Sequence, residues 1–474
     1  MQCVYVTLPL FFIIFPFLYF LSFFFLYLLS LSILYLLPHS LHPLLFLSLS
    51  FSLCLSLHPL PPPSFSPSSL SFFLSLSLSA SLSYSLCLSL HPPLSLSRGR
   101  KCKPIFVQIA RQVVKLNASD LRLPSRAWKV KLVGEGADDA GGVFDDTITE
   151  MCQELETGVV DLLIPSPNAT AEVGYNRDRF LLSPSSCLDE QLLQLKFLGI
   201  LMGVAIRTKK PLDLHLAPMV WKQLCCIPLV LEDLEEVDLL YVQTLNSILH
   251  IEDSGITEDN FHEMIPLDSF VGQSADGKMV PIIPGGNSIP LTFSNRKEYV
   301  ARAIEYRLHE IDRQVAVVRE GMSWIVPVPL LSLLTAKQLE QMVCGMPEIS
   351  VDVLKKVVRY REVEEHHTQV QWFWQTLEDF SNEERVLFMR FVSGRSRLPA
   401  NTADISQRFQ IMKPYDSLPT SQTCFFQLRL PPYSSQTVMA ERLRYAINNC
   451  RSIDMDNYML SRNVDNAEGS DTDY

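Results

Sequence analysis

The sequence predicts an α+β chain in which helices dominate and short strands are added. Long segments such as 188–207 carry apolar residues at a period near 3.6, which is typical of amphipathic helices. Short segments alternate at period two, as in 127–133 and 426–430, which is typical of half-buried strands. The run Gly345-Met346-Pro347 interrupts this pattern, so we predict a domain boundary there.

The first hundred residues differ from the rest of the chain. No Asp, Glu, Lys or Arg precedes Arg98, and the segment 11–37 is long and apolar enough to span a bilayer. No basic residues flank that segment to set its orientation, however, and the sequence up to residue 97 alternates Leu-Ser, Phe-Ser and His-Pro. We interpret residues 1–100 as a low-complexity segment that forms no folded domain. Pyrimidine-rich codons encode Leu, Ser, Phe and Pro, so we expect this segment to be intron or untranslated sequence that was translated in error. A membrane anchor and a disordered leader are the alternatives.

The remaining residues carry the whole net charge of −11, which is typical of an acidic globular protein. They contain no basic stripe, so we expect no nucleic-acid partner. The eleven cysteines form no CxxC pair and no Cys/His spacing typical of a metal site, so we predict neither a metal nor a cofactor. Free thiols fit a reducing compartment. We therefore predict a cytoplasmic location, and expect no membrane partner despite the apolar N-terminus.

Up to the boundary, periodicity predicts mostly helix. The 188–207 helix is predicted to be core, where Gly199 and Gly203 allow close packing. Short β elements are expected at 127–133 and 279–283. The expected helices are 104–117, 145–155, 188–207, 212–224, 239–251, 295–321 and 330–343.

Beyond the boundary, shorter helices alternate with strands. Ser381 and Glu384 form the capping box of a predicted helix, and 451–474 is expected to be an acidic tail outside the fold. The expected helices are 351–361, 370–380, 382–393 and 435–450, with a strand candidate at 408–412.

Cys424 lies where a polar run gives way to the apolar alternation of 426–430. Pro419 and the pair Pro431-Pro432 bracket this element, because proline cannot donate to a sheet ladder. The pattern places the Cys424 thiol on an accessible loop at the mouth of a strand. Spacing alone leaves a buried structural cysteine as the alternative, since most cysteines are small hydrophobes of the core.

Several segments, taken together and in order, resemble the HECT family of ubiquitin ligases. The C-terminal stretch looks most like the giant HERC subfamily, which implies that this chain is the C-terminal part of a longer protein. The segments that carry the resemblance are 134–142, Phe197-Leu198-Gly199, Pro284-Gly285-Gly286, 297–300, Cys344-Gly345, Trp372-Phe373-Trp374, 391–394, 396–399, 418–420, 423–425, 428–431 and 433–435.

The resemblance implies a bilobal domain. A larger, mostly helical N-lobe that binds the conjugating enzyme would occupy 104–345, and a smaller α/β C-lobe would occupy 351–450. A short hinge at 346–350 would join them. For the conjugating enzyme we expect a docking face on the 239–251 helix, with ordinary core packing as the alternative. The residues of that face are Leu240, Leu245, Ile248 and Leu249.

The family's catalytic cysteine falls on Cys424, which implies that this residue carries ubiquitin as a glycyl thioester before transfer to a substrate lysine. Thr423, Gln422 and Phe425 are the expected supporting residues. The family often has His two residues before the cysteine and Asn two after it, where this chain has Gln422 and Phe426. These departures leave a second hypothesis, a catalytically weak module that binds conjugating enzyme or ubiquitin as a scaffold.

Overall fold

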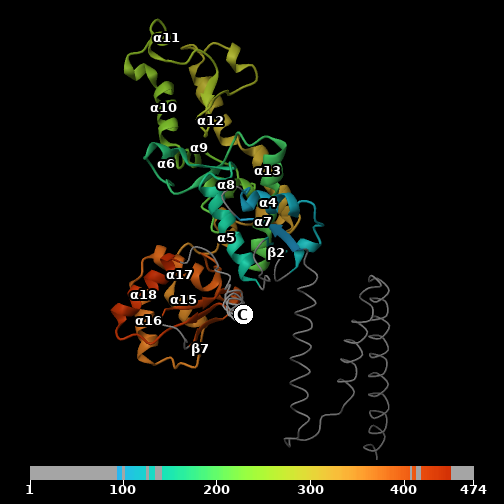
Figure 1. The fold of residues 1–474 in the computed structure, drawn as a ribbon. Coiled ribbons are helices and arrows are strands. Elements are labelled where there is room, and N and C mark those ends of the chain that lie inside the picture. Colours follow the sequence, from blue (N-terminus) through green and yellow to red (C-terminus); the bar gives the residue numbers. More distant parts are fainter. Residues whose placement is uncertain are drawn as a thin grey trace, which may run out of the picture. The chain divides into compact units, whose positions relative to one another are not determined.

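The computed structural model describes residues 93–98, 102–123, 127–133, 141–405, 408–412 and 418–449. The candidate membrane span at 11–37, the Gly-rich loop at 134–140 and the acidic tail at 451–474 lie outside the described residues. The chain divides into two compact units, Met1–Leu90 and His91–Tyr474. All described residues belong to the second unit, whose helices and strands are labelled in Figure 1.

Three clusters of buried apolar side chains build this unit. The main core runs from Leu94 to Cys344, and the small core lies between Leu245 and Ala303. The C-terminal core begins at Ile349 and ends at Ile447. The chain therefore leaves one core and enters the next at the Gly-Met-Pro run that predicted a boundary.

The main core is organised around α7 (Asp189–Thr208), which packs along α13 (Asp312–Ser323). A Cβ added at Gly199 would lie 1.9 Å from the carbonyl oxygen of Val318, so glycine is needed for this close approach, as predicted. Among the described residues α7 is the one helix long and apolar enough to cross a membrane, and 67% of its apolar window is buried inside the protein. The other elements around this core are β1 (Pro93–Leu96), α4 (Ile105–Val113), η1 (Asp120–Arg122), β2 (Lys129–Leu132), α5 (Gly142–Glu156), β3 (Leu163–Pro165), α6 (Pro167–Ala171), β4 (Phe180–Leu182), α8 (Pro218–Leu224), α9 (Leu231–Glu235), η4 (Val328–Leu333) and α14 (Ala336–Cys344).

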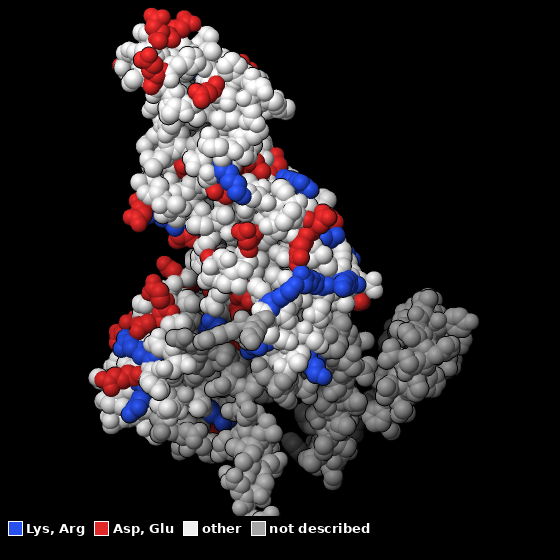
Figure 2. All heavy atoms as spheres, turned by 45° about the horizontal axis from the view of Figure 1, so that its top comes forward, with Lys and Arg blue, Asp and Glu red and all other residues white. Residues whose placement is uncertain are grey.

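The small core lies between two helices, α10 (Leu239–Leu249) and α12 (Arg296–His309). Exposed acids gather on the chain between these helices, and Figure 2 shows acidic side chains clustered at this end of the unit. Arg307 is buried at the base of α12, where it binds Asp238 at 2.8 Å and Glu310 at 3.0 Å. The remaining elements here are η2 (Ile251–Ser254), α11 (Phe261–Met264), β5 (Val271–Gln273), β6 (Met279–Pro281) and η3 (Gly286–Ser288).

The C-terminal core packs helices against a four-stranded sheet of order β7-β8-β10-β9. Strands β7, β8 and β10 run parallel, and β9 pairs antiparallel with β10 at the edge. The predicted capping box is confirmed, because the Ser381 side chain accepts from the Glu384 amide and Glu384 accepts from the Ser381 amide. The elements are α15 (Val351–Val357), β7 (Val358–Arg361), α16 (Thr368–Asp379), α17 (Asn382–Ser393), η5 (Thr402–Asp404), β8 (Phe409–Met412), β9 (Thr420–Gln422), η6 (Thr423–Phe425), β10 (Gln427–Arg429) and α18 (Gln436–Asn449).

Four of the predicted helices are wrong in extent. The 330–343 helix is divided into the 3-10 helix η4, which ends at Leu333, and α14, which begins at Ala336. The 295–321 helix breaks at Glu310-Ile311, because α12 faces the small core whereas α13 faces the main core. The 212–224 helix begins only at Pro218, since the preceding residues are extended beside β4 and proline favours the first helical turn. The 351–361 helix ends at Val357, and the β-branched and aromatic residues after it form β7.

Part of the segment assigned to 1–100 belongs to the fold, which corrects the prediction at its end. β1 pairs in parallel with β2, and its Leu94 and Leu96 side chains are 3% and 0% exposed. Arg98 then reaches α5, where it binds Asp146 at 2.8 Å and Glu150 at 2.9 Å. The apolar alternation of Leu and Ser is a half-buried strand at this position, because β2 offers it a partner. The boundary therefore falls near residue 91 rather than at residue 100.

Removing β1 should destabilise the unit. A chain that begins at Lys101 lacks two buried leucines, each worth about 2 kcal/mol, so we expect a loss of about 4 kcal/mol against a chain that begins at His91. Urea unfolding followed by tryptophan fluorescence measures the difference. Ser95→Ala, which alters the exposed face of the same strand, is the matched control. Equal stability of the two chains would contradict the placement of β1.

Candidate active site

Cys424 lies in η6, the short turn that joins β9 to β10. The two strands pair Gln422 with Gln427 and Ser421 with Leu428, so the turn closes a hairpin at the sheet edge. The predicted loop position at the mouth of a strand is therefore confirmed. The thiol is half-buried and forms no disulfide.

The hairpin is fixed to α17 and to the sheet. Ser421 Oγ donates to the Phe391 carbonyl oxygen at 2.6 Å, and the Gln410 amide of β8 donates to the Phe426 carbonyl oxygen at 3.0 Å. Beyond the turn, Leu428 is fully buried in the C-terminal core. These bonds hold Cys424 at a defined place, because both of its flanking strands are anchored.

The turn lies against the first residue of α5. A Cβ added at Gly142 would lie 2.5 Å from Thr423 Oγ1 and 3.0 Å from Cys424 Sγ. Glycine at the start of α5 therefore makes room for the cysteine turn.

The structure separates the three predicted supporting residues. Thr423 is half-buried beside Gly142, which brings it together with Cys424. Gln422 is exposed, and Phe425 is 59% exposed. Gln422 and Phe425 thus flank the thiol on its open side, where an incoming partner could meet them.

Phe426 is a left-handed residue with a φ of 50°, a conformation that costs most side chains about 1–2 kcal/mol. It is also 4% exposed, and its ring packs on Phe409 with centroids 5.1 Å apart. The related family often has Asn at this position, which adopts this conformation readily. Burial of an aromatic ring offsets the backbone strain in this chain.

Replacing Phe426 by Asn should therefore destabilise the C-terminal core. The loss of ring burial, about 3 kcal/mol, exceeds the relief of backbone strain, so we expect a net cost of about 1–2 kcal/mol in chemical unfolding. Phe425→Asn is the matched control and should change stability by less than about 0.5 kcal/mol, because its ring is exposed. A stabilised F426N variant would show that the strain outweighs the packing.

Two adjacent acids in the first turns of α5, Asp145 and Asp146, face basic residues from distant segments. Asp145 binds Arg395 at 2.7 Å and Lys210 at 2.8 Å, and both acids are buried. Burial by itself raises the pKa of Asp145, but the charges of Arg395 and Lys210 outweigh it and hold the pKa below its ordinary value. Asp145 is therefore a carboxylate at neutral pH.

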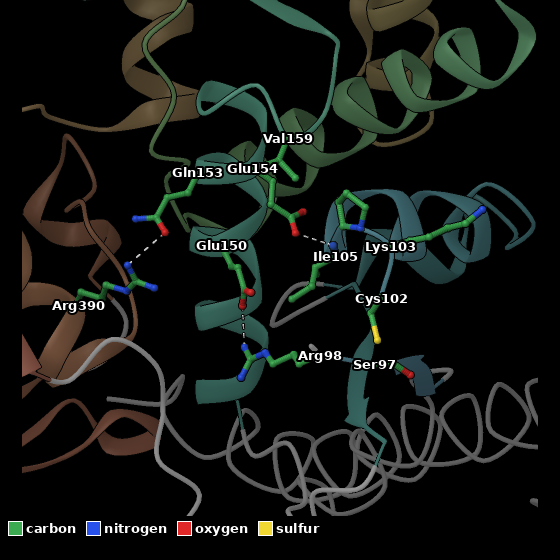
Figure 3. A pocket seen from close by; sticks show the side chains of 11 residues that line it. Ser97, Arg98, Cys102, Lys103, Ile105, Glu150, Gln153, Glu154, Val159 and Arg390 are labelled. Atoms are coloured by element: carbon green, nitrogen blue, oxygen red, sulfur yellow. Dashed lines mark hydrogen bonds and ion pairs between the residues drawn. The ribbon is translucent and has the colours of Figure 1, made fainter. Parts of the chain in front are cut away.

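A hollow of about 600 Å³ borders the outer face of α5 (Figure 3). Four of its lining residues are paired: Arg98 contacts Glu150, and Arg390 of α17 donates to Gln153 at 3.3 Å. Sequence reasoning did not single out any of these residues. Their side chains fasten α17 and the N-terminal strand to the same helix that borders Cys424.

Two of the other cysteines, Cys152 and Cys344, are poor candidates for a nucleophile. Burial raises the pKa of the Cys152 thiol far above its ordinary value and that of Cys344 to about 12. Both are fully buried in the main core. Cys102, Cys187 and Cys226 are exposed, whereas Cys424 is half-buried in a turn whose neighbours are hydrogen-bonded to α17 and β8.

The predicted docking face on α10 is wrong for two of its four residues. Leu245 and Ile248 are 1% and 5% exposed, because they pack into the small core. Leu249 is half-buried against the same core, and Leu240 is 47% exposed. A helix periodicity locates the apolar face but does not say whether a neighbouring helix covers it.

Comparison with known proteins first shows to which domain family the chain belongs. The family model described as HECT-domain (ubiquitin-transferase) matches residues 149–456, which include both the C-terminal core and Cys424. The chain belongs to the HECT-domain family, and the resemblance found in its motifs is confirmed.

The individual proteins to which the chain is similar are named as ubiquitin ligases. The chain is 46% identical over 364 residues to E3 ubiquitin-protein ligase HERC2 of Homo sapiens, which covers 75% of this chain and 7% of that protein. It is 30% identical over 390 residues to probable E3 ubiquitin-protein ligase HECTD4 of Homo sapiens, covering 72% of this chain and 10% of the relative. E3 ubiquitin-protein ligase TOM1 of Saccharomyces cerevisiae is 30% identical over 330 residues, which cover 68% of this chain and 10% of the relative. The chain thus spans a tenth or less of the length of these curated relatives.

Proposed function

We propose that this chain is the ubiquitin-transferring part of an E3 ubiquitin-protein ligase, with Cys424 as the residue that carries ubiquitin. Membership of the HECT-domain family supports the reaction class. One observation carries the assignment to Cys424: its half-buried thiol lies in an anchored hairpin turn, whereas Cys152 and Cys344 are fully buried. A transferring thiol must be reached by two large partners in turn, and a core cysteine cannot be.

The proposed reaction has two steps. In the first, the Cys424 thiolate attacks the carbonyl carbon of the ubiquitin thioester on a conjugating enzyme; a new C–S bond forms and the enzyme's thiolate leaves. In the second, the neutral amine of a substrate lysine attacks the new thioester. A C–N bond forms, the bond to Cys424 Sγ breaks, and the amine loses a proton to water. Thioester exchange is nearly isoenergetic, so positioning of the reacting groups governs its rate.

We infer that the main and small cores form the N-lobe and that the C-terminal core forms the C-lobe. Buried apolar packing stops at Cys344 and resumes at Ile349, which supports a hinge at 346–350. Few apolar contacts would have to break for the lobes to reorient there. Movement of the C-lobe would carry Cys424 between its two partners.

The conjugating enzyme, in this proposal, docks on the part of the N-lobe built on the small core. Leu240 and Met264 are 47% and 58% exposed there, and exposed acids surround Met264. Leu240→Asp should then slow loading of Cys424 without slowing discharge. Leu333→Asp is the matched control, because Leu333 is 78% exposed on η4 of the main core. An equal effect of both variants would sink this placement.

Charging of the full chain with ubiquitin tests the function. The chain is incubated with ubiquitin, ATP, activating enzyme and a panel of conjugating enzymes, and the products are separated with and without reductant. We expect a ubiquitin adduct that reductant removes, followed by reductant-stable ubiquitin conjugates. Binding of a conjugating enzyme without any such adduct would instead support the scaffold hypothesis.

The state of the thiols supports a reducing compartment. The seven cysteines within the described residues are all free of disulfides, and four of them are at least partly exposed. We therefore place the chain in the cytoplasm. Immunofluorescence together with fractionation of cells that express the full chain checks this, and recovery with membranes after a carbonate wash would contradict it.

A further inference from the structure

A short segment after α17, Gly394–Leu398, links the C-terminal core to α5 and is called the clasp here. Arg395 binds Asp145 at 2.7 Å, and the Gly394 carbonyl oxygen accepts from Thr149 Oγ1 at 2.9 Å. The Asp145 side chain is 7% exposed and that of Arg395 is 19% exposed, so water screens this pair weakly.

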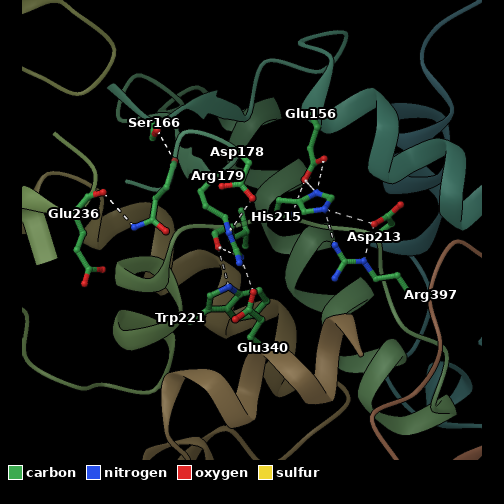
Figure 4. Close-up of polar contacts among 12 residues, drawn as sticks. Glu156, Ser166, Asp178, Arg179, Asp213, His215, Trp221, Glu236, Glu340 and Arg397 are labelled. Carbon is green, nitrogen blue, oxygen red and sulfur yellow. Dashed lines mark hydrogen bonds and ion pairs between the residues drawn. The ribbon is translucent and has the colours of Figure 1, made fainter. Parts of the chain in front are cut away.

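A second pair fixes the other end of the clasp. Arg397 Nε donates to Asp213 at 2.6 Å, and Arg397 Nη2 lies 2.6 Å from His215 Nε2. Since the guanidinium can only donate, His215 Nε2 accepts, and the ring proton lies on Nδ1, which is 3.0 Å from Glu156. Figure 4 shows this row of Glu156, His215, Arg397 and Asp213.

The clasp and the cysteine turn are mechanically connected. α17 precedes the clasp directly, and its Phe391 carbonyl oxygen accepts from Ser421 in the strand that leads to Cys424. The clasp therefore holds α17, and with it Cys424, against Gly142 at the start of α5. Release of Arg395 and Arg397 would remove the two ion-paired contacts of the clasp and leave the weaker bond from Arg390 to Gln153 between α17 and α5.

The clasped arrangement suits transfer of ubiquitin to the substrate amine better than it suits loading of Cys424 by the conjugating enzyme. Figure 1 shows α10–α12 at one end of the described unit and α15–α18 at the other, with α5, α7 and α8 between them. A conjugating enzyme on the small core would thus be remote from Cys424. A substrate amine needs only the open side of the thiol, where Gln422 and Phe425 are exposed.

We propose that Arg395 and Arg397 are positioning residues for ubiquitin transfer, which hold Cys424 beside Gly142 while the thioester passes to the substrate amine and unpair from Asp145 and Asp213 for loading. This inference rests on the proposed function of Cys424. In this proposal the ion-paired clasp favours discharge over loading of Cys424. Mutation of the clasp should therefore change the rate of discharge without an equal change in the rate of loading.

Single-turnover kinetics of the full chain test the proposal. Loading is followed with a ubiquitin-charged conjugating enzyme; discharge is followed after loading with ubiquitin bearing a C-terminal mercaptoethanesulfonate thioester and a chase with free lysine. For Arg395→Glu we expect discharge to fall about tenfold or more, since a displacement near 1 Å can cost a hundredfold, while loading falls less than about twofold or rises.

A matched swap separates the clasp from general charge effects. Lys355→Glu with Glu378→Lys reverses an ion pair on the surface of the C-terminal core and should change neither rate. Thermal unfolding reports whether each variant folds, and Arg395→Lys provides a milder variant, which should lose less discharge activity, if the charge reversal does not fold. Parallel loss of both rates, or unchanged discharge in R395E, would overturn the clasp. Absence of any thioester in the unmodified chain would instead overturn the proposed function.

Discussion

Replacing Cys424 by alanine should abolish ubiquitin transfer by this chain, with a fall of at least about a thousandfold in conjugate formation. The loss follows because the proposed reaction passes through a covalent bond to Cys424 Sγ, and Cys424 is the one thiol of the turn 423–425. Conjugates to a lysine-containing acceptor, quantified over time with a cognate conjugating enzyme, provide the measurement. Binding of the conjugating enzyme should be unchanged, since the candidate docking site lies on the small core.

Two further variants show whether the loss of transfer in Cys424→Ala is specific to this thiol. Cys187→Ala removes another exposed thiol and should retain full transfer. Cys424→Ser should trap ubiquitin as an oxyester that reductant does not cleave, because a serine hydroxyl keeps the same position. Normal transfer by C424A would exclude the covalent route through this residue.

The largest expected effect on stability comes from Gly199. A Cβ at this position would lie 1.9 Å from the Val318 carbonyl oxygen and 2.9 Å from the Met322 amide, so Gly199→Ala must push α7 and α13 apart. Both helices lie in the centre of the main core, and separating them loosens many buried side chains. We expect destabilisation of about 3–5 kcal/mol, measured by urea unfolding.

Gly255 offers the control for this prediction. It has a φ of 76° and nothing within 4 Å of an added Cβ, so Gly255→Ala meets backbone strain without a clash. Its expected cost is about 1 kcal/mol. Similar losses of stability in G199A and G255A would show that separation of the two helices is not the main cause of the loss.

Local patterns predicted the elements that carry their own signals. The capping box at Ser381 and Glu384 located the start of α17, and the spacing of apolar residues located α7 with its closely packed glycine. Cys424 was placed correctly on a loop at the mouth of a strand, because the polar-to-apolar switch and the bracketing prolines lie near it in sequence. Each of these signals spans only a few residues.

Contacts between distant segments could not be predicted in the same way. Arg395 and Asp145 are 250 positions apart, and nothing in either neighbourhood indicates the other. The apolar period of 295–321 continues across the break at residue 310, because α12 and α13 are each amphipathic toward a different core. Leu245 and Ile248 have the pattern of a docking face, but α12 covers them.

The most direct test of the central claim is to locate the ubiquitin adduct. The full chain is charged, quenched in acid and digested with pepsin at low pH, which preserves thioesters, and the peptides are identified by mass spectrometry. We predict a peptide in which the C-terminal carboxyl of ubiquitin is bound to Cys424, and loss of that mass shift after treatment with a thiol. Conjugates that form while the adduct lies on another cysteine, or while no thioester-linked peptide exists, would contradict the assignment of Cys424.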